Sequence, residues 1–415
     1  MELDTGMTAW ILTSASLVLL MTPGLAFFYG GMSRAKSVLN MMMMSFGVMG
    51  VVGVIYVLWG WSMSYADQSI GGIFGNPFEQ FGLSGAITDA SGAYVMSDGL
   101  PVIVDVGFQV TFAIITTALI SGALAERVKF STWLVFAGLW VTFSYFPMAH
   151  MVWGGGLLSG DGPFAAIAEP IDFAGGTVVH INAGVAALVL ALVIGTRKGF
   201  GSEPMRPHNL PFVMLGAALL WFGWFGFNAG SAYNADGLAG LAWVNTTTAT
   251  AAAMLGWLLV EKLRDGHATS LGAASGIVAG LVAITPAAGA LSPVGAIALG
   301  AIAGAACAFA VGLKYKLGFD DSLDVVGVHL VGGLVGTVLI GFLATEGGLL
   351  YGGGISLLIV QILIALAAVI FSGVVTFVIA SALKATMGWR IGENEEITGI
   401  DSAEHRETAY EPIAR

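Results

Sequence analysis

Charged side chains are scarce in this sequence of 415 residues, because Asp, Glu, Lys and Arg together make up only 10% of it. An ordinary soluble domain has roughly 25%. So few charges cannot cover the surface of a water-soluble fold of this length, which excludes a cytosolic enzyme and a disordered chain. The net charge of −11 also excludes a polyanion-binding protein, and we expect no nucleic-acid partner.

Cysteine is almost absent. Cys307 is the only one in the sequence, so neither an internal disulfide nor a paired-cysteine metal or redox motif can form. The sequence also contains no nucleophile elbow, phosphate-binding loop or metal-ligand spacing. We therefore expect a protein that is not an enzyme and that has no metal or other cofactor.

Apolar residues and glycine are abundant instead. Hydrophobic residues make up 57% of the chain, the mean hydropathy is +0.87, and there are 60 glycines. This combination favours closely packed membrane helices, because small residues let helix backbones approach one another. Eleven stretches reach the ~20 apolar residues that a helix needs to cross a bilayer. They lie near residues 8–31, 38–65, 101–125, 131–153, 172–195, 210–230, 239–261, 269–288, 293–313, 324–345 and 353–384.

The basic residues indicate an orientation in the membrane. All 15 of them follow odd-numbered stretches, and the loops after even-numbered stretches have none. Because Lys and Arg concentrate in cytoplasmic loops, this pattern predicts an all-α membrane protein with its N-terminus outside and its C-terminus in the cytoplasm. The first residues, Met1 to Asp4, lack the basic region of a signal peptide, so we expect the first stretch to remain as a helix.

Two histidines lie inside apolar stretches: His180 in the fifth and His329 in the tenth. A polar side chain at that depth needs a partner or a water-filled path. The two positions suggest two five-helix repeats of opposite topology plus an eleventh helix, with a transport site between the repeats. One alternative is two unrelated histidines, each hydrogen-bonded in a helix interface. Another is a haem with two histidine ligands, for which the crowded neighbouring stretches leave little room.

The surroundings of the two histidines contain few charges. Within these two stretches the only charged residues are Asp172 and Asp324, at their ends. A pair of imidazoles in an apolar channel suits an uncharged, hydrogen-bonding substrate or a proton relay. Aromatic side chains, which attract small cations, and one serine gather near the predicted outer ends of other stretches. These residues are Phe108, Phe112, Trp153, Phe227 and Ser231. Plain helix packing is the alternative for the phenylalanines, and a helix cap is the alternative for Asp172.

At these residues the sequence resembles the Amt branch of the ammonium transporter (Amt/Mep/Rh) family. The resemblance extends from about Thr22 to Tyr410 and therefore covers nearly the whole chain. The matching strings are DFAGGTVVHINA at 172–183, PHNLP at 207–211, GWFGFNAGS at 223–231, DVVGVH at 324–329 and GIDSAEHRETAY at 399–410.

The resemblance implies a homotrimer in the bacterial cytoplasmic membrane, with one pore through each eleven-helix subunit. It divides the chain into a transmembrane domain at 1–384 and a cytoplasmic regulatory tail at 385–415. Within the first, the repeats would cover about 8–195 and 210–345, and the extra helix about 353–384. A cytoplasmic PII-type regulatory protein is the implied partner. Composition alone is typical of a solvated, partly disordered tail, whereas the resemblance implies a tail ordered against a neighbouring subunit.

The resemblance also assigns roles to individual residues. Trp153, Phe112 and Ser231 would form an outer ammonium recruitment site, Phe112 and Phe227 the gate, and His180 and His329 the pore, with Asp172, Trp224 and Phe108 in support.

These roles suggest how ammonium is separated from potassium. The two ions have nearly the same radius and charge, but only ammonium can release a proton. A dry gate penalises any ion, so we expect NH4+ to be recruited and deprotonated and NH3 to pass, with the proton following along the histidines. Net uptake of ammonium, and of methylammonium if it enters, would then be electrogenic. An ammonium sensor with little flux is the alternative, although the tail is too short for a fused signalling domain.

Overall fold

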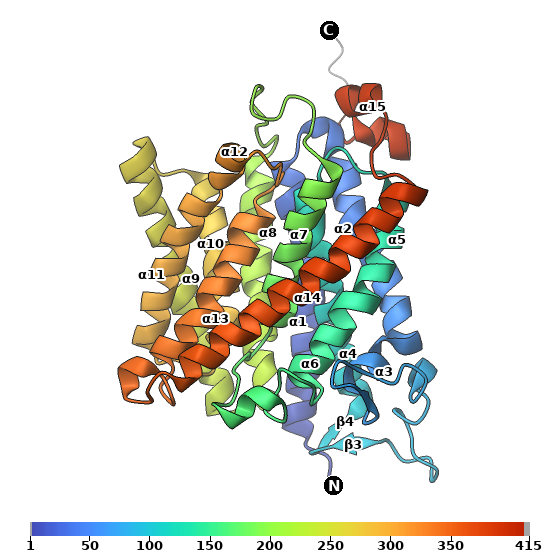
Figure 1. The fold of residues 1–415 in the computed structure, drawn as a ribbon, viewed down its shortest axis with the longest axis vertical. Helices are drawn as coiled ribbons and strands as arrows, with labels where there is room; N and C mark the ends of the chain where they lie inside the picture. Colours follow the sequence, from blue (N-terminus) through green and yellow to red (C-terminus); the bar gives the residue numbers. More distant parts are fainter. Residues whose placement is uncertain (1, 411–415) are drawn as a thin grey trace.

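The computed structural model of the protein describes residues 2–410 and consists of a bundle of long helices (Figure 1). Within these residues, ten helical segments are long and apolar enough to cross a membrane. The chain is therefore an all-helical, multi-pass membrane protein. The ten segments are Thr5–Met32, Ala35–Tyr65, Val102–Leu124, Phe130–Trp153, Gly176–Ile194, Leu210–Ala232, Ser270–Ala287, Pro293–Leu317, Val326–Leu343 and Ser356–Thr386.

The stretch expected as the seventh span forms a helix that is long but less apolar than these ten. This is α9 (Gly237–Asp265), with 29 residues, which packs against α10 (Ser270–Ile284) and α11 (Pro293–Ala310). Three successive threonines at 246–248 and a charged end from Glu261 onward lower its hydropathy. Ten of the eleven expected spans are thus found by length and composition, and the seventh is found as a helix.

Glycine brings α9 and α11 into close contact. A Cβ atom added at Gly300 would lie 2.1 Å from the carbonyl oxygen of Ala249, and one at Gly304 would lie 2.1 Å from that of Ala253. Neither position can accept a side chain unless the helices move apart. The abundance of glycine therefore reflects helix packing at this interface, as the composition predicted.

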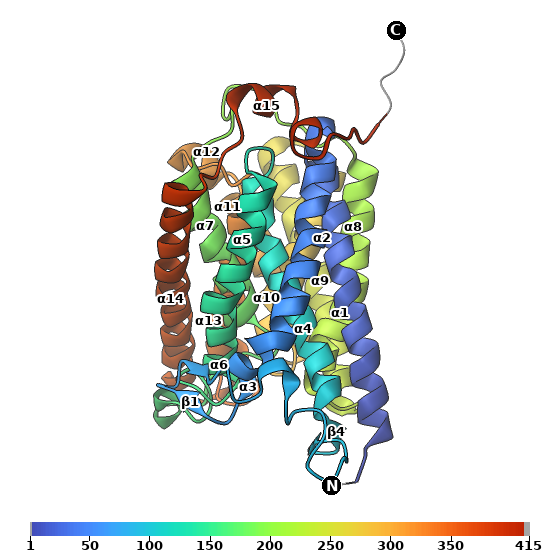
Figure 2. The same ribbon diagram turned by 90° about the vertical axis from the view of Figure 1, so that its right-hand side faces the viewer.

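The remaining elements complete the bundle and its two ends. Two short antiparallel hairpins, β1–β2 and β3–β4, lie at the end of the molecule where the N-terminus is found (Figures 1 and 2). The helix α14 crosses one face of the bundle diagonally in Figure 1 and stands along one edge in Figure 2. The bounds are α1 (Thr5–Met32), α2 (Val38–Ile55), α3 (Trp61–Tyr65), β1 (Ser69–Ile70), β2 (Phe74–Gly75), β3 (Met96–Ser97), β4 (Leu100–Pro101), α4 (Val102–Ile120), α5 (Phe130–Trp140), α6 (Phe146–Trp153), α7 (Asn182–Ile194), α8 (Leu210–Trp224), α12 (Leu313–Leu317), α13 (Val331–Leu343), α14 (Ser356–Thr386) and α15 (Glu393–Thr398).

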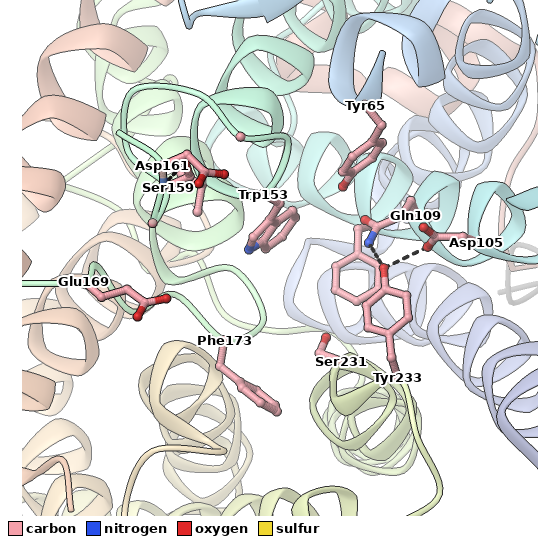
Figure 3. A pocket seen from close by; sticks show the side chains of 14 residues that line it. Tyr65, Asp105, Gln109, Trp153, Ser159, Asp161, Glu169, Phe173, Ser231 and Tyr233 are labelled. Atoms are coloured by element: carbon pink, nitrogen blue, oxygen red, sulfur yellow. Dashed lines mark hydrogen bonds between the residues drawn. The ribbon is translucent and has the colours of Figure 1, made fainter. Parts of the chain in front are cut away.

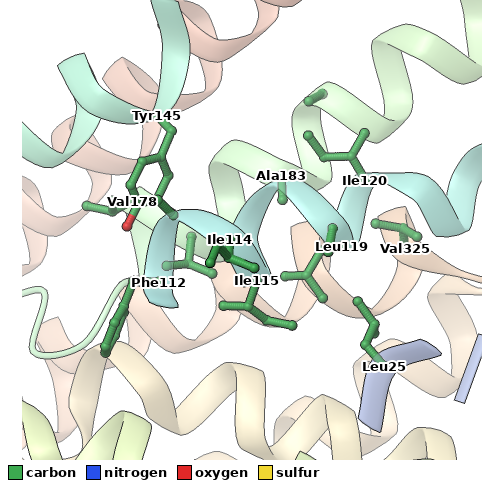
Figure 4. Packing of buried hydrophobic residues seen from close by; sticks show 14 of the residues in the cluster. Leu25, Phe112, Ile114, Ile115, Leu119, Ile120, Tyr145, Val178, Ala183 and Val325 are labelled. Carbon is green, nitrogen blue, oxygen red and sulfur yellow. The ribbon is translucent and has the colours of Figure 1, made fainter. Parts of the chain in front are cut away.

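The helix α4 lies at the centre of the apolar core. All of its residues from Thr111 to Ile120 are buried. Figure 4 shows Ile114, Ile115 and Leu119 of this helix among side chains of other elements, including Leu25 of α1. Because α4 also carries Phe112, this packing holds the expected gate residue on a rigid element.

The C-terminal tail is ordered against its own chain, so the partly disordered tail favoured by composition is wrong for residues 385–410. The Asp401 carboxylate accepts hydrogen bonds from the backbone N–H groups of Leu39 (3.0 Å) and Asn40 (2.7 Å) at the start of α2. The Glu396 carboxylate accepts one from the backbone of Lys198 (2.7 Å). Acidic side chains of the tail thus bind helix and loop N–H groups that the bundle leaves unpaired. Residues 411–415 lie outside the described part of the chain.

Two histidines outside the membrane-spanning segments take part in the same docking. His405 Nε2 lies 3.0 Å from Asn40 Oδ1, and His208 Nε2 lies 2.9 Å from the Tyr410 hydroxyl. Both contacts join residues more than 200 positions apart, so the sequence around each histidine does not reveal them.

A network of buried ion pairs joins the loops beneath the tail. Arg197 forms a two-point contact with Asp320, with N–O distances of 2.8 and 2.9 Å, and also lies 3.6 Å from Glu126. Burial alone would raise the pKa values of these two carboxyl groups, but Arg197 together with Arg34 at Glu126 and Arg127 at Asp320 holds both below their ordinary values. The network therefore ties the loop at 125–129 to the loops that flank the two histidine-bearing segments.

Candidate functional site

A cavity of about 700 Å³ (Figure 3) lies at the end of the bundle where α6 ends and where the N-terminus is found (Figure 1). Trp153 at the end of α6, Phe112 on α4 and Ser231 all line it. The Ser231 hydroxyl donates a hydrogen bond to the Phe227 carbonyl (2.8 Å), so its oxygen lone pairs are free to accept one. The three residues expected to recruit ammonium thus lie around a single cavity.

Phe112, at the wall of this cavity, packs against a second phenylalanine that lies behind it. The rings of Phe112 and Phe227 stack with centroids 4.2 Å apart and planes at 30°, and both side chains are buried. The rings of Trp153 and Phe112 form a T-shaped contact, with centroids 6.2 Å apart and planes at 87°. Neither Phe227 nor Phe108 is among the residues that line the cavity, and the ring of Phe108 packs against Phe112 with centroids 4.8 Å apart and planes at 75°. Phe108 therefore supports the ring of Phe112.

The two histidines meet directly beyond the phenylalanines. Their rings lie 5.4 Å apart at 25°, and the two Nδ1 atoms are 3.3 Å apart. One Nδ1 must carry a proton and the other must be bare for this contact to be a hydrogen bond, so the two rings cannot both be imidazolium. The His180 ring lies 6.2 Å from the ring of Phe227 at 27°. The expected gate and the expected histidine pair thus form one continuous row of nearly parallel rings.

Trp224 lies beside this row. Its ring stacks on His180 at 5.5 Å and 20°, and its Nε1–H donates to the Thr285 hydroxyl (2.8 Å). The indole is buried and its one polar atom is paired, so it presents an apolar face to His180. Among the residues that the structure describes, His180 Nε2 has no hydrogen-bond partner, and this buried nitrogen is available to a small hydrogen-bonding molecule.

Asp172 holds the start of the segment that carries His180. Its carboxylate accepts hydrogen bonds from the backbone N–H groups of Gly175 (2.8 Å), Gly176 and Thr177 (2.8 Å), and its carbonyl accepts one from Trp153 Nε1 (3.0 Å). This is the helix cap that stood as the alternative interpretation. Because the same residue also orients Trp153, it connects the recruitment residues to the histidine segment.

The matching acid in the other half of the chain is Asp321, which sequence reasoning missed. Asp172 precedes His180 by eight residues, and Asp321 precedes His329 by eight. The Asp321 carboxylate accepts from the backbone N–H groups of Val325 (2.9 Å) and Val326 (2.7 Å). Asp324, to which the sequence drew attention, instead pairs with Lys314 (2.7 Å). The equal spacing of eight residues is the sequence signal that could have identified Asp321.

Each capped segment begins with a π-helical turn that contains the histidine. These turns are Gly176–Ile181 and Val326–Leu330, and a third, Phe225–Ala229, contains Phe227. Such turns are rare and occur frequently at functional sites. Apolar periodicity does not reveal them, because they change the helical register without changing the composition.

Comparisons with known proteins agree over the length of the chain. The model of the Ammonium Transporter Family matches residues 9–410. The "Ammonium transporter" of Mycobacterium tuberculosis is 58% identical, covering 98% of this chain and 91% of its own, and that of Aquifex aeolicus is 50% identical, covering 99% and 94%. The crystal structure of Candida albicans Mep2 superposes with a TM-score of 0.86 at 32% identity, covering 95% of this chain and 88% of that one.

Proposed function

Because the chain belongs to the ammonium transporter family, we propose that it takes up ammonium across the bacterial cytoplasmic membrane by deprotonating it at the phenylalanine pair. One observation carries this proposal: the Phe112–Phe227 stack lies between a polar cavity and a pair of buried histidines. An ion in the cavity can interact with aromatic faces and with the Ser231 oxygen. Beyond the stack, the path offers apolar surface and imidazole nitrogens.

The chemistry of the row favours a neutral molecule beyond the gate. A bare cation pressed between the rings of Phe112 and Phe227 would lose its water and gain no counter-charge, which is very costly. Ammonia avoids this cost because it is uncharged. His180 Nε2, which lacks a partner among the described residues, can exchange a hydrogen bond with it. His180 Nε2 can accept the proton that ammonium releases while the Nδ1 proton of His180 shifts to His329 Nδ1, so the proton follows the ammonia and net transport is electrogenic.

We also propose the wider architecture that family membership suggests: eleven crossings with α9 as the seventh, the N-terminus outside, and five-helix repeats of opposite topology within 1–384. The equivalent positions of Asp172–His180 and Asp321–His329 support the repeats. The tail contacts loops that contain basic residues, including Lys36, at the end of the bundle opposite to the N-terminus, which supports a cytoplasmic tail. Assembly as a homotrimer and binding of a PII-type protein are proposed on the family resemblance.

Current from purified protein in proteoliposomes tests the transport mechanism. We expect an inward current after a jump in external ammonium and none after an equal jump in potassium. His180→Ala and His329→Ala should abolish the current, while the exposed His267→Ala serves as the matched histidine control and should keep it. Internal alkalinisation without current would contradict the electrogenic mechanism, and binding without flux would favour the sensor.

A further inference from the structure

Three residues of the cavity wall form a polar cluster that the recruitment site does not use. The Gln109 side-chain amide donates to the Tyr233 hydroxyl (2.7 Å), and that hydroxyl donates to Asp105 Oδ1 (2.8 Å). Figure 3 shows the three side chains together beside Ser231. Asp105 and Gln109 lie one helical turn apart on α4, and Tyr233 lies two residues after Ser231.

The cluster leaves two acceptor atoms without donors. A hydroxyl has one proton, and Tyr233 gives it to Asp105, so Gln109 must present its N–H to Tyr233 and turn its Oε1 away. Gln109 is 7% exposed, and its Oε1 has no hydrogen-bond partner among the residues that the structure describes. The second oxygen of the Asp105 carboxylate likewise has no donor within residues 2–410. Gln109 Oε1 is a buried acceptor without a donor, which is costly, whereas the Asp105 side chain is partly exposed at the cavity wall. A ligand with N–H groups in the cavity would give both oxygens a donor.

The backbone at Tyr233 supports a specific role for this side chain. Its φ is +63°, in the left-handed region that residues with side chains rarely adopt. The residue is held there by its two hydrogen bonds and by the ring of Phe108, 5.8 Å away at 87°. Strained residues of this kind concentrate at ligand sites. Here the strain places the phenol between Asp105 and Gln109, which orients both of them toward the cavity.

We propose that Asp105 and Gln109, oriented by Tyr233, form a second ammonium subsite at the wall of the cavity, before the Trp153–Phe112–Ser231 site. The Asp105 carboxylate supplies the only charge of the cluster, and Gln109 Oε1 supplies a second acceptor. An ammonium ion matches both, because it has one positive charge and four N–H donors. This subsite raises the local ammonium concentration ahead of the gate and leaves the gate itself unchanged. The inference rests on the proposed transport function.

The test measures the half-saturation concentration of the ammonium current in proteoliposomes for three variants. Asp105→Asn keeps an oxygen that accepts from Tyr233 but removes the charge. It should raise the half-saturation concentration by about three- to tenfold, since one partly shielded unit charge is worth that much, and leave the maximal current within twofold. Tyr233→Phe keeps the charge but removes the hydrogen bonds, and it should have the smaller effect. Asp161→Asn changes another acid of the same cavity wall, which is exposed, and it should stay within twofold of the unmodified protein.

The outcomes separate a binding role from a structural one. If the cluster only holds the backbone, Tyr233→Phe will equal or exceed Asp105→Asn, and the proposal is overturned. Equal increases in the half-saturation concentration for Asp105→Asn and Asp161→Asn would also overturn the proposal. They would indicate that any negative charge on the cavity wall attracts ammonium to the same extent. The effect of Asp105→Asn should shrink at high ionic strength, and an effect independent of salt contradicts the proposal.

Two further results keep the test decisive. If Asp105→Asn does not yield folded protein, Gln109→Leu replaces it. Gln109→Leu and Tyr233→Phe both lose the hydrogen bond between these two residues, but only Gln109→Leu loses the acceptor Oε1. Gln109→Leu should therefore raise the half-saturation concentration more than Tyr233→Phe does. Absence of ammonium current in the unmodified protein would refute the transport function itself. A normal current whose half-saturation concentration is unchanged in Asp105→Asn would refute only the subsite.

Discussion

Replacement of Asp321 by Asn tests whether this carboxylate holds the histidine segment of the second half. Each of its oxygens accepts one backbone N–H, from Val325 at 2.9 Å and from Val326 at 2.7 Å. An amide offers only one acceptor oxygen, so one of these buried N–H groups would face an NH2 group instead. An unsatisfied buried donor costs about 1–3 kcal/mol, and loss of the charge weakens the remaining bond. We therefore expect Asp321→Asn to lower the free energy of unfolding by about 2–3 kcal/mol.

The same substitution should impair transport. His329 lies in the π-helical turn whose start Asp321 caps. Its contact with His180 requires the two Nδ1 atoms to stay about as close as the 3.3 Å in the structure. Loosening of the turn lengthens this distance, so the ammonium current should fall together with the thermal stability. The measurements are thermal unfolding of the purified protein in detergent and the proteoliposome current.

Asp324→Asn is the matched control for this prediction. Asp324 pairs with Lys314 at 2.7 Å, but its side chain is 22% exposed. Its φ of +66° is one that Asn also tolerates. We expect a loss of no more than about 1 kcal/mol, as for a partly exposed ion pair. A larger loss for Asp324→Asn than for Asp321→Asn would refute the assignment of Asp321 as the cap.

Three further predictions concern the gate, the helix packing and the loops. Phe227→Ala removes one of two rings stacked at 4.2 Å, so a potassium current should appear beside the ammonium current; strict exclusion of potassium would argue against the stack as the ion barrier. Gly304→Val places a Cβ 2.1 Å from the Ala253 carbonyl oxygen, so folded protein should be lost or destabilised by at least about 3 kcal/mol; near-normal thermal unfolding would contradict the close packing of α9 and α11. Glu126 and Asp320 have pKa values in the folded protein below their ordinary values of 4.5 and 3.8. Their ion pairs therefore stabilise the fold at a pH above these ordinary pKa values, and this stabilisation is lost as the pH falls through the pKa values of the folded protein. Thermal unfolding between pH 7 and pH 3 should show this loss, and Glu126→Gln should flatten it.

The predictions from sequence succeeded where local composition is sufficient. A membrane helix is specified by the residues within it, because the bilayer removes water from every backbone group along the span. The apolar stretches therefore located ten spanning segments and, at α9, an eleventh long helix. The same reasoning marked His180 and His329 as unusual, because a polar side chain inside such a stretch needs a specific reason.

The resemblance to family motifs also allowed residues of the candidate site to be predicted from the sequence. The structure brings Phe112, Trp153 and Ser231 to one cavity and places Phe227 and His180 directly beyond it. These residues come from four separate spans, so neither periodicity nor spacing could have joined them. The resemblance singled them out, while their roles in transport remain the proposals set out above.

Only the tertiary structure decided the polar contacts between distant parts of the chain. The docking of Asp401 on α2 and the Asp105–Tyr233 hydrogen bond both depend on which N–H or O–H groups the packed bundle leaves unpaired. Hydrophobic burial is additive along the sequence and can be read from it. Hydrogen bonds depend on distances of a few tenths of an ångström between residues that the fold brings together, and the sequence alone does not contain those distances.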